Sequence, residues 1–126
     1  MHIAEAIKKI VFVDDDVLGL NTYRRCMRNT DYDVQYFTSP KKAIKYIENN
    51  EVMLLVSDER MPEMLGHELI NKVNGKCTSV LLTGYATDKV STLLPSGVKI
   101  MIKEGMEEIR KIKEIAKHLA MAGDKC

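Results

Sequence analysis

The chain has 126 residues, a formal net charge of +1 and a charged fraction of 29%, which suits one domain with a sizeable hydrophobic core. The balanced and scattered charges predict no direct nucleic-acid binding. No apolar run is long enough for a membrane span or a signal peptide. The three cysteines are far apart and not at metal-ligand spacing with histidine. We therefore expect a cytoplasmic protein with reduced thiols, in which residues 1–126 form a single domain.

Short apolar runs alternate with amphipathic segments along the chain. Each run is too short for a helix and rich in branched side chains, as buried parallel strands are. Each segment between them has apolar residues three or four positions apart, as on one face of a helix. In chain order we expect a strand over residues 8–13, a helix over 17–28, a strand over 34–37, a helix over 40–49, a strand over 52–56, a helix over 66–74, a strand over 79–82, a helix over 88–94, a strand over 98–102 and a helix over 107–120.

Local boundary signals agree with these elements. Ser39 and Pro40 are typical of an N-cap followed by the first turn of a helix. Pro95 and Gly97 stop the fourth helix. Strict alternation of strands and helices predicts a parallel sheet whose crossover helices cover both faces.

Polar residues stand where four of these strands end. They are Asp14, Asp15 and Asp16 after the first strand, Asp58 after the third, Thr83 after the fourth and Lys103 after the fifth. In open parallel sheets, ligands bind just outside the carboxyl ends of the strands. Carboxylates that converge there would repel one another unless a cation lay between them, and an all-oxygen site suits Mg²⁺.

Such a site has the parts that phosphoryl transfer needs. Bound Mg²⁺ leaves positions open for phosphate oxygens, while Lys103 adds a positive charge and Thr83 a hydroxyl donor. A carboxylate can itself be the nucleophile and form an aspartyl phosphate. Asp16 also has a simpler explanation as the N-cap of the first helix.

Four motifs in this order carry a resemblance to a known family: VDDD at residues 13–16, SDERMP at 57–62 with Met64 and Gly66, LLTGYA at 81–86 and IMIK at 100–103. Together they resemble the receiver domain of two-component response regulators, over about residues 8–122. The resemblance implies a flavodoxin-like doubly wound sheet of five parallel strands in the order 2-1-3-4-5, with helices on both faces.

The resemblance also implies a role for each site residue. These roles are phosphoacceptor and metal ligand for Asp58, direct Mg²⁺ ligand for Asp15, water-mediated ligand for Asp14, a backbone carbonyl ligand from Arg60, switch hydroxyl for Thr83 and phosphoryl partner for Lys103. The implied protein is a phosphorylation switch with self-catalysed phosphoryl transfer and autodephosphorylation rather than an enzyme. A histidine kinase or a phosphotransfer protein would be the donor.

The output implied is a change of affinity at the face formed by the fourth helix, the fifth strand and the last helix. The partner would be a downstream protein, a covalently linked output domain, or a second copy of the chain that forms a homodimer. The amino-acid sequences of the motifs also resemble those of receivers joined to further domains. The chain is therefore expected either to act alone or to be one domain of a larger regulator.

Two positions depart from the family pattern. Glu104 stands where a proline usually follows the lysine, often after a cis peptide bond, and a cis bond before a non-proline residue costs about 2.5–4 kcal/mol. We therefore expect a trans bond there. Ile100 replaces an aromatic residue that usually reports phosphorylation. Both departures suggest an alternative interpretation beside the phosphorylation switch, a pseudo-receiver that binds partners without taking phosphate.

A phosphatase of the haloacid-dehalogenase type is a further alternative, since Asp14 and Asp16 flank one residue after a strand. Asp14 would then carry the phosphate, but the threonine expected two places beyond Asp16 is Leu18. The three histidines, His2, His67 and His118, have no partners at ligand spacing and are expected on the solvated surface.

Overall fold

The computed structural model describes residues 7–84, 88–103, 105 and 107–123. The helices and strands alternate as the sequence predicts. In chain order they are β1 (Lys9–Val13), α1 (Val17–Cys26), β2 (Asp33–Phe37), α2 (Pro40–Asn49), β3 (Val52–Asp58), α3 (Gly66–Lys72), β4 (Thr78–Thr83), α4 (Asp88–Thr92), β5 (Lys99–Ile102) and α5 (Glu107–Gly123). Two differences bear on function: β3 continues through Asp58, and α4 has only five residues.

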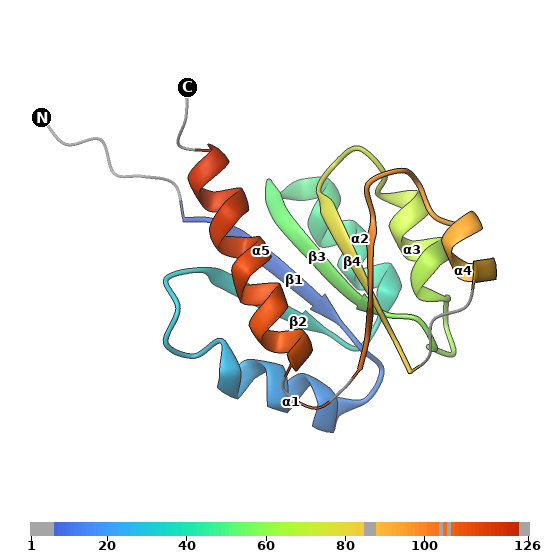
Figure 1. Ribbon diagram of the computed structural model, residues 1–126, viewed down its shortest axis with the longest axis horizontal. Helices are drawn as coiled ribbons and strands as arrows, with labels where there is room; N and C mark the ends of the chain where they lie inside the picture. Colours follow the sequence, from blue (N-terminus) through green and yellow to red (C-terminus); the bar gives the residue numbers. More distant parts are fainter. Residues whose placement is uncertain (1–6, 85–87, 104, 106, 124–126) are drawn as a thin grey trace, which may run out of the picture.

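The five strands form one sheet in the order β2-β1-β3-β4-β5, and every neighbouring pair is parallel. This confirms the predicted flavodoxin-like fold. Figure 1 shows β1 and β3 in the middle of the sheet, with helices in front of it and behind it. Because all strands run the same way, their carboxyl ends lie along one edge.

Alternate residues of the central strands build two cores, one on each face of the sheet. On the first face, Ile10 and Phe12 of β1 pack with residues of α1 and α5 such as Leu20 and Ile112. On the second face, Val11 and Val13 of β1 pack with residues of α2 and α3. The central strands are therefore buried on both sides, which explains why their sequences are continuous apolar runs.

Side chains cap the N-termini of two helices, as predicted. Asp16 accepts a hydrogen bond from the backbone N–H of Leu18 at 3.0 Å, and Ser39 accepts one from that of Lys42 at 3.3 Å. Both contacts satisfy amide groups that a helix start leaves open.

Within the described part of the chain, Cys26 and Cys77 are free thiols, and Cys126 lies outside it. Among the residues that the structure places, none forms a helix with the length and apolar character needed to cross a bilayer.

Candidate functional site

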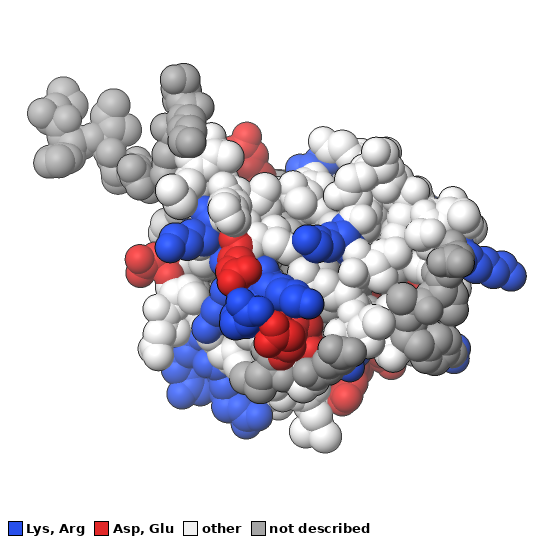
Figure 2. Space-filling model, viewed as in Figure 1, with Lys and Arg blue, Asp and Glu red and all other residues white. Residues whose placement is uncertain are grey.

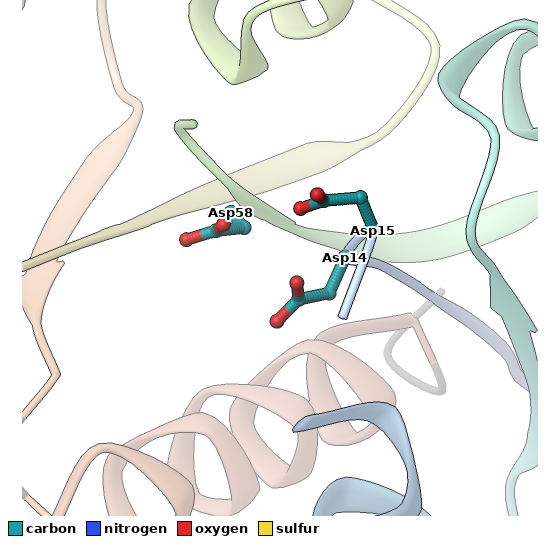
Figure 3. Close-up of side chains that lie close together, drawn as sticks. All are labelled: Asp14, Asp15 and Asp58. Atoms are coloured by element: carbon teal, nitrogen blue, oxygen red, sulfur yellow. The ribbon is translucent and has the colours of Figure 1, made fainter. Parts of the chain in front are cut away.

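Three carboxylates meet where β1 and β3 end. Asp14 and Asp15 directly follow β1, Asp58 is the last residue of β3, and one oxygen from each lies within 4.8 Å of the others. Figure 3 shows the three side chains extending in the same direction from the strand ends. Asp14 is buried, Asp58 is half-buried and Asp15 is exposed. The site is thus open to solvent on the side of Asp15.

Lys103 directly follows β5 and reaches into this cluster. Its Nζ lies 2.7 Å from Oδ1 of Asp58 and 3.6 Å from Oδ2 of Asp14. Its backbone N–H donates to the carbonyl oxygen of Thr83 at 2.9 Å, which fixes the lysine relative to β4. Burial acts to lower the pKa of Lys103, but the hydrogen bond to Asp58 and the charges of Asp14 and Asp58 outweigh it, so the pKa is raised. The lysine is therefore a permanent cation at neutral pH.

The surroundings of Asp14 disfavour the negative charge of its carboxylate. Burial raises its pKa, and this outweighs the hydrogen bond from the Asp16 N–H and the charge of Lys103, while the charges of Asp58 and Asp15 raise the pKa further. The folded protein thus favours a neutral group or an added positive charge at this position.

The donor set fits Mg²⁺. All three candidate ligands are carboxylates with an oxygen within 4.8 Å of the others, and an all-oxygen donor set of this kind suits Mg²⁺. Lys103 offsets only one of three negative charges, so a divalent cation would complete the balance. The exposure of Asp15 leaves room for the waters that Mg²⁺ retains.

Two glycines allow the chain to pass close to Asp58 and Asp14. A Cβ at Gly66 would lie 2.2 Å from the carbonyl oxygen of Asp58, and one at Gly19 would lie 2.9 Å from Oδ2 of Asp14. In the sequence, Gly66 stands out only as part of a loop motif, and no pattern singles out Gly19. A glycine that follows an acidic strand end by a few residues is a weak signal for such a close approach.

Two further predicted residues, Thr83 and Arg60, lie along the same edge of the sheet. Thr83 is buried at the end of β4, paired in register with Ile102 of β5, and Arg60 is exposed two residues after Asp58. Ile100 is half-buried in β5. Glu104, whose effect on the lysine loop the sequence raises, lies outside the described residues.

One prediction about the histidines is wrong. His67 is only 16% exposed, and its Nδ1 lies 2.7 Å from the carboxylate of Glu59. The two residues are eight positions apart and meet only because the loop after β3 folds back on α3, so spacing alone gave no sign of the pair. His118 is exposed as predicted, whereas His2 is not among the described residues.

Replacing Asp14 with Asn should stabilise the metal-free protein at neutral pH. The raised pKa means that protonated Asp14 contributes stability below the ordinary value of 3.8, and this contribution is lost as the pH rises through the raised value. Asparagine keeps an oxygen for the Asp16 N–H but carries no charge. We expect the melting temperature at pH 7 to rise by about 3–6 °C, the shift that a change near 1 kcal/mol produces at this size.

Thermal melts of both proteins from pH 3 to pH 8 without divalent metal would check this. The wild-type protein should lose stability relative to the variant as the pH rises above 3.8. An unchanged or lower melting temperature of D14N at pH 7 would contradict the electrostatic account.

Comparison with known proteins agrees with this geometry. The family model described as the response regulator receiver domain matches residues 10–114. Transcriptional regulatory protein FlgR of Helicobacter pylori is 30% identical over 93 residues, which cover 72% of this chain and 24% of FlgR. This chain thus spans about a quarter of that regulator's length. Two-component response regulator ORR3 of Oryza sativa is 26% identical over 100 residues, covering 79% of this chain and 75% of ORR3.

The fold also matches solved structures. Response regulator protein TrrA from Thermotoga maritima, solved in complex with Mg(2+)-BeF, superposes with a TM-score of 0.73 at 22% identity. The match covers 90% of this chain and 99% of the TrrA chain.

Proposed function

This chain belongs to the response regulator receiver domain family, and from that premise we propose that Asp58 accepts a phosphoryl group from a histidine kinase or a phosphotransfer protein. The observation that carries the proposal is the meeting of Asp14, Asp15 and Asp58 at one edge, with the Lys103 ammonium 2.7 Å from Asp58. These groups come from three separate strands, and their convergence supplies both a nucleophile and balancing positive charge.

The proposed step is a displacement at phosphorus. An oxygen of the Asp58 carboxylate attacks the phosphoryl group, a P–O bond forms, and the bond from phosphorus to the donor nitrogen breaks. The electron pair of that bond returns to the donor imidazole. Self-catalysed hydrolysis of the aspartyl phosphate by water would later reset the switch, so the protein is a phosphoacceptor rather than an enzyme acting on a separate substrate.

Asp15, Asp58 and the backbone carbonyl of Arg60 would hold Mg²⁺ directly, and Asp14 would contribute through a water. When bound, Mg²⁺ supplies charge neutralisation between the carboxylates and the phosphoryl oxygens. The structure of TrrA in complex with Mg(2+)-BeF supports this assignment by analogy of fold.

Lys103 and Thr83 would serve the transferred group. The Lys103 ammonium, which pairs with an Asp58 oxygen, would pair with a phosphoryl oxygen after transfer. The Thr83 hydroxyl, at the end of the neighbouring strand, would donate to another. Movement of Thr83 would then change the packing behind α4 and β5.

The output surface is proposed to be the face formed by α4, β5 and α5. Figure 2 shows that charged side chains gather over α5 on this side of the molecule, whereas the region between α5 and α4 is mostly uncharged. Leu93 after α4 and Ile102 of β5 are 44% and 41% exposed. A downstream protein, a linked output domain or a second copy of the chain would bind here, with affinity set by phosphorylation.

Treatment with acetyl phosphate and Mg²⁺ tests the proposal. We expect intact-mass measurement to show one phosphoryl adduct that decays after the small-molecule donor is removed. Beryllofluoride with Mg²⁺ should also perturb the NMR spectrum of the protein. If neither reagent has an effect and Mg²⁺ does not bind, the chain is a pseudo-receiver.

A further inference from the structure

Glu59, the residue directly after the phosphoacceptor, has both carboxylate oxygens engaged by a single residue of α3. Its Oε1 accepts the backbone N–H of His67 at 2.8 Å, and its Oε2 lies 2.7 Å from Nδ1 of the His67 ring. The side chain of Glu59 is 12% exposed, so the contact is largely shielded from water. Neither residue has a part in the phosphoryl chemistry proposed above.

The main chain of Glu59 is held as firmly as its side chain. Its N–H donates to the carbonyl oxygen of Leu82 in β4, and its own carbonyl oxygen accepts the N–H of Gly66, both at 2.9 Å. The loop of residues 60–65 therefore starts and closes at Glu59. Arg60, whose carbonyl is assigned to the metal, is the first residue of that loop.

The start of α3 explains why this carboxylate is needed. Leu65 precedes the helix and offers no side-chain acceptor for its open amide groups. Glu59 supplies the missing acceptor to His67 from eight residues away. From within the helix, Oε1 of Glu68 accepts a hydrogen bond from the N–H of Leu65 at 3.1 Å. Loss of the Glu59 side-chain contact would leave the His67 amide unpaired, and the loop would then be closed by the backbone bond from the Gly66 N–H to the Glu59 carbonyl alone.

We propose that Glu59 is a positioning residue: by binding His67 it holds the loop of residues 60–65, and with it the Arg60 carbonyl, where that carbonyl completes the Mg²⁺ site. This inference rests on the proposed function. It assigns a role in metal affinity to a side chain that does not contact the metal, as partners of metal ligands commonly have.

Three variants of the full chain test the proposal: Glu59→Ala, Glu59→Gln and Glu63→Ala. The first two remove the same charge, but glutamine keeps an oxygen for the His67 N–H. Glu63 is the matched control, because it lies in the same loop and accepts hydrogen bonds from Ser39 Oγ at 2.8 Å and the Lys41 N–H at 2.9 Å, at the start of α2 rather than α3.

Two quantities are measured: the Mg²⁺ dissociation constant by calorimetry, and amide exchange of His67 in metal-free protein. For Glu59→Ala we expect Mg²⁺ binding to weaken about 10-fold and His67 exchange to quicken about 5-fold. Glu59→Gln should recover most of both losses. Glu63→Ala should leave both values near those of the wild-type protein.

Equal losses in Glu59→Ala and Glu59→Gln would overturn the proposal, since the cause would then be charge and not contact. Equal losses in Glu59→Ala and Glu63→Ala would also overturn it, because any loosening of the loop would suffice. A wild-type chain that binds Mg²⁺ but takes no phosphoryl group would refute only the proposed function, and the Mg²⁺ comparison would still decide the positioning role. A wild-type chain that does not bind Mg²⁺ would refute both.

Discussion

Replacing Asp58 with Asn is expected to abolish the phosphoryl adduct that acetyl phosphate and Mg²⁺ produce. The amide has no carboxylate oxygen to attack phosphorus, and the change also removes one of the three converging metal ligands. Intact-mass measurement of wild-type and variant protein under the same conditions checks this. We expect complete loss of the adduct and weaker Mg²⁺ binding, with the fold retained.

The matched control is Asp16→Asn. Asp16 lies in the same acidic turn, but its carboxylate caps α1 by accepting the Leu18 N–H, and asparagine is an equally good N-cap. This variant should take phosphate as the wild-type protein does. An adduct that survives Asp58→Asn would place the covalent chemistry on another carboxylate, with Asp14 the position that the phosphatase alternative requires.

The second large effect is expected from Gly66→Ala. The added Cβ would lie 2.2 Å from the carbonyl oxygen of Asp58 and 2.7 Å from Cδ1 of Leu81. The first of these atoms is backbone at the end of a buried central strand, so it cannot move without disturbing the sheet. Overpacking of this kind costs about 3 kcal/mol in unfolding free energy. Urea denaturation followed by circular dichroism would measure the loss.

Gly84→Ala is the control for this substitution. Among the described residues, no atom lies within 4 Å of a Cβ at Gly84, and Gly84 has no left-handed backbone angle, so the change should stay within about 0.5 kcal/mol of the wild-type value. A Gly66→Ala protein as stable as Gly84→Ala would show that the loop can move away from Asp58. Such mobility would also weaken the case for a fixed Arg60 carbonyl.

The sequence predicted the order of elements because each local signal agrees with the global fold. The apolar runs of β1 and β3 are continuous since both faces of these strands are buried, and a continuous run bounded by acidic residues is easy to detect. Caps at Asp16 and Ser39 are local contacts, so they too are readable from spacing. The short fourth helix, Asp88–Thr92, is shorter than predicted, because helix ends are weakly specified by local signals.

Contacts between segments far apart in the sequence were harder to predict from the sequence. The pairing of Glu59 with His67 depends on the return path of a loop, and neither residue type nor spacing indicates it. The close approach of Gly19 to Asp14 is likewise not predictable from the sequence, because a glycine can occur in a helix for many reasons. That Asp15, Asp58 and Lys103 lie at one edge of the sheet was predictable from topology, because parallel strands bring their carboxyl ends to the same edge.

The amino-acid sequence by itself determined which residues end the strands and that those strands are parallel, since periodicity and alternation are properties of the chain read in order. Only the tertiary structure decided how the charges interact: that Asp14 is buried with a raised pKa, that Lys103 lies 2.7 Å from Asp58, and that Glu59 is bound to α3. Burial and separation in space set these energies, and neither is a property of sequence distance.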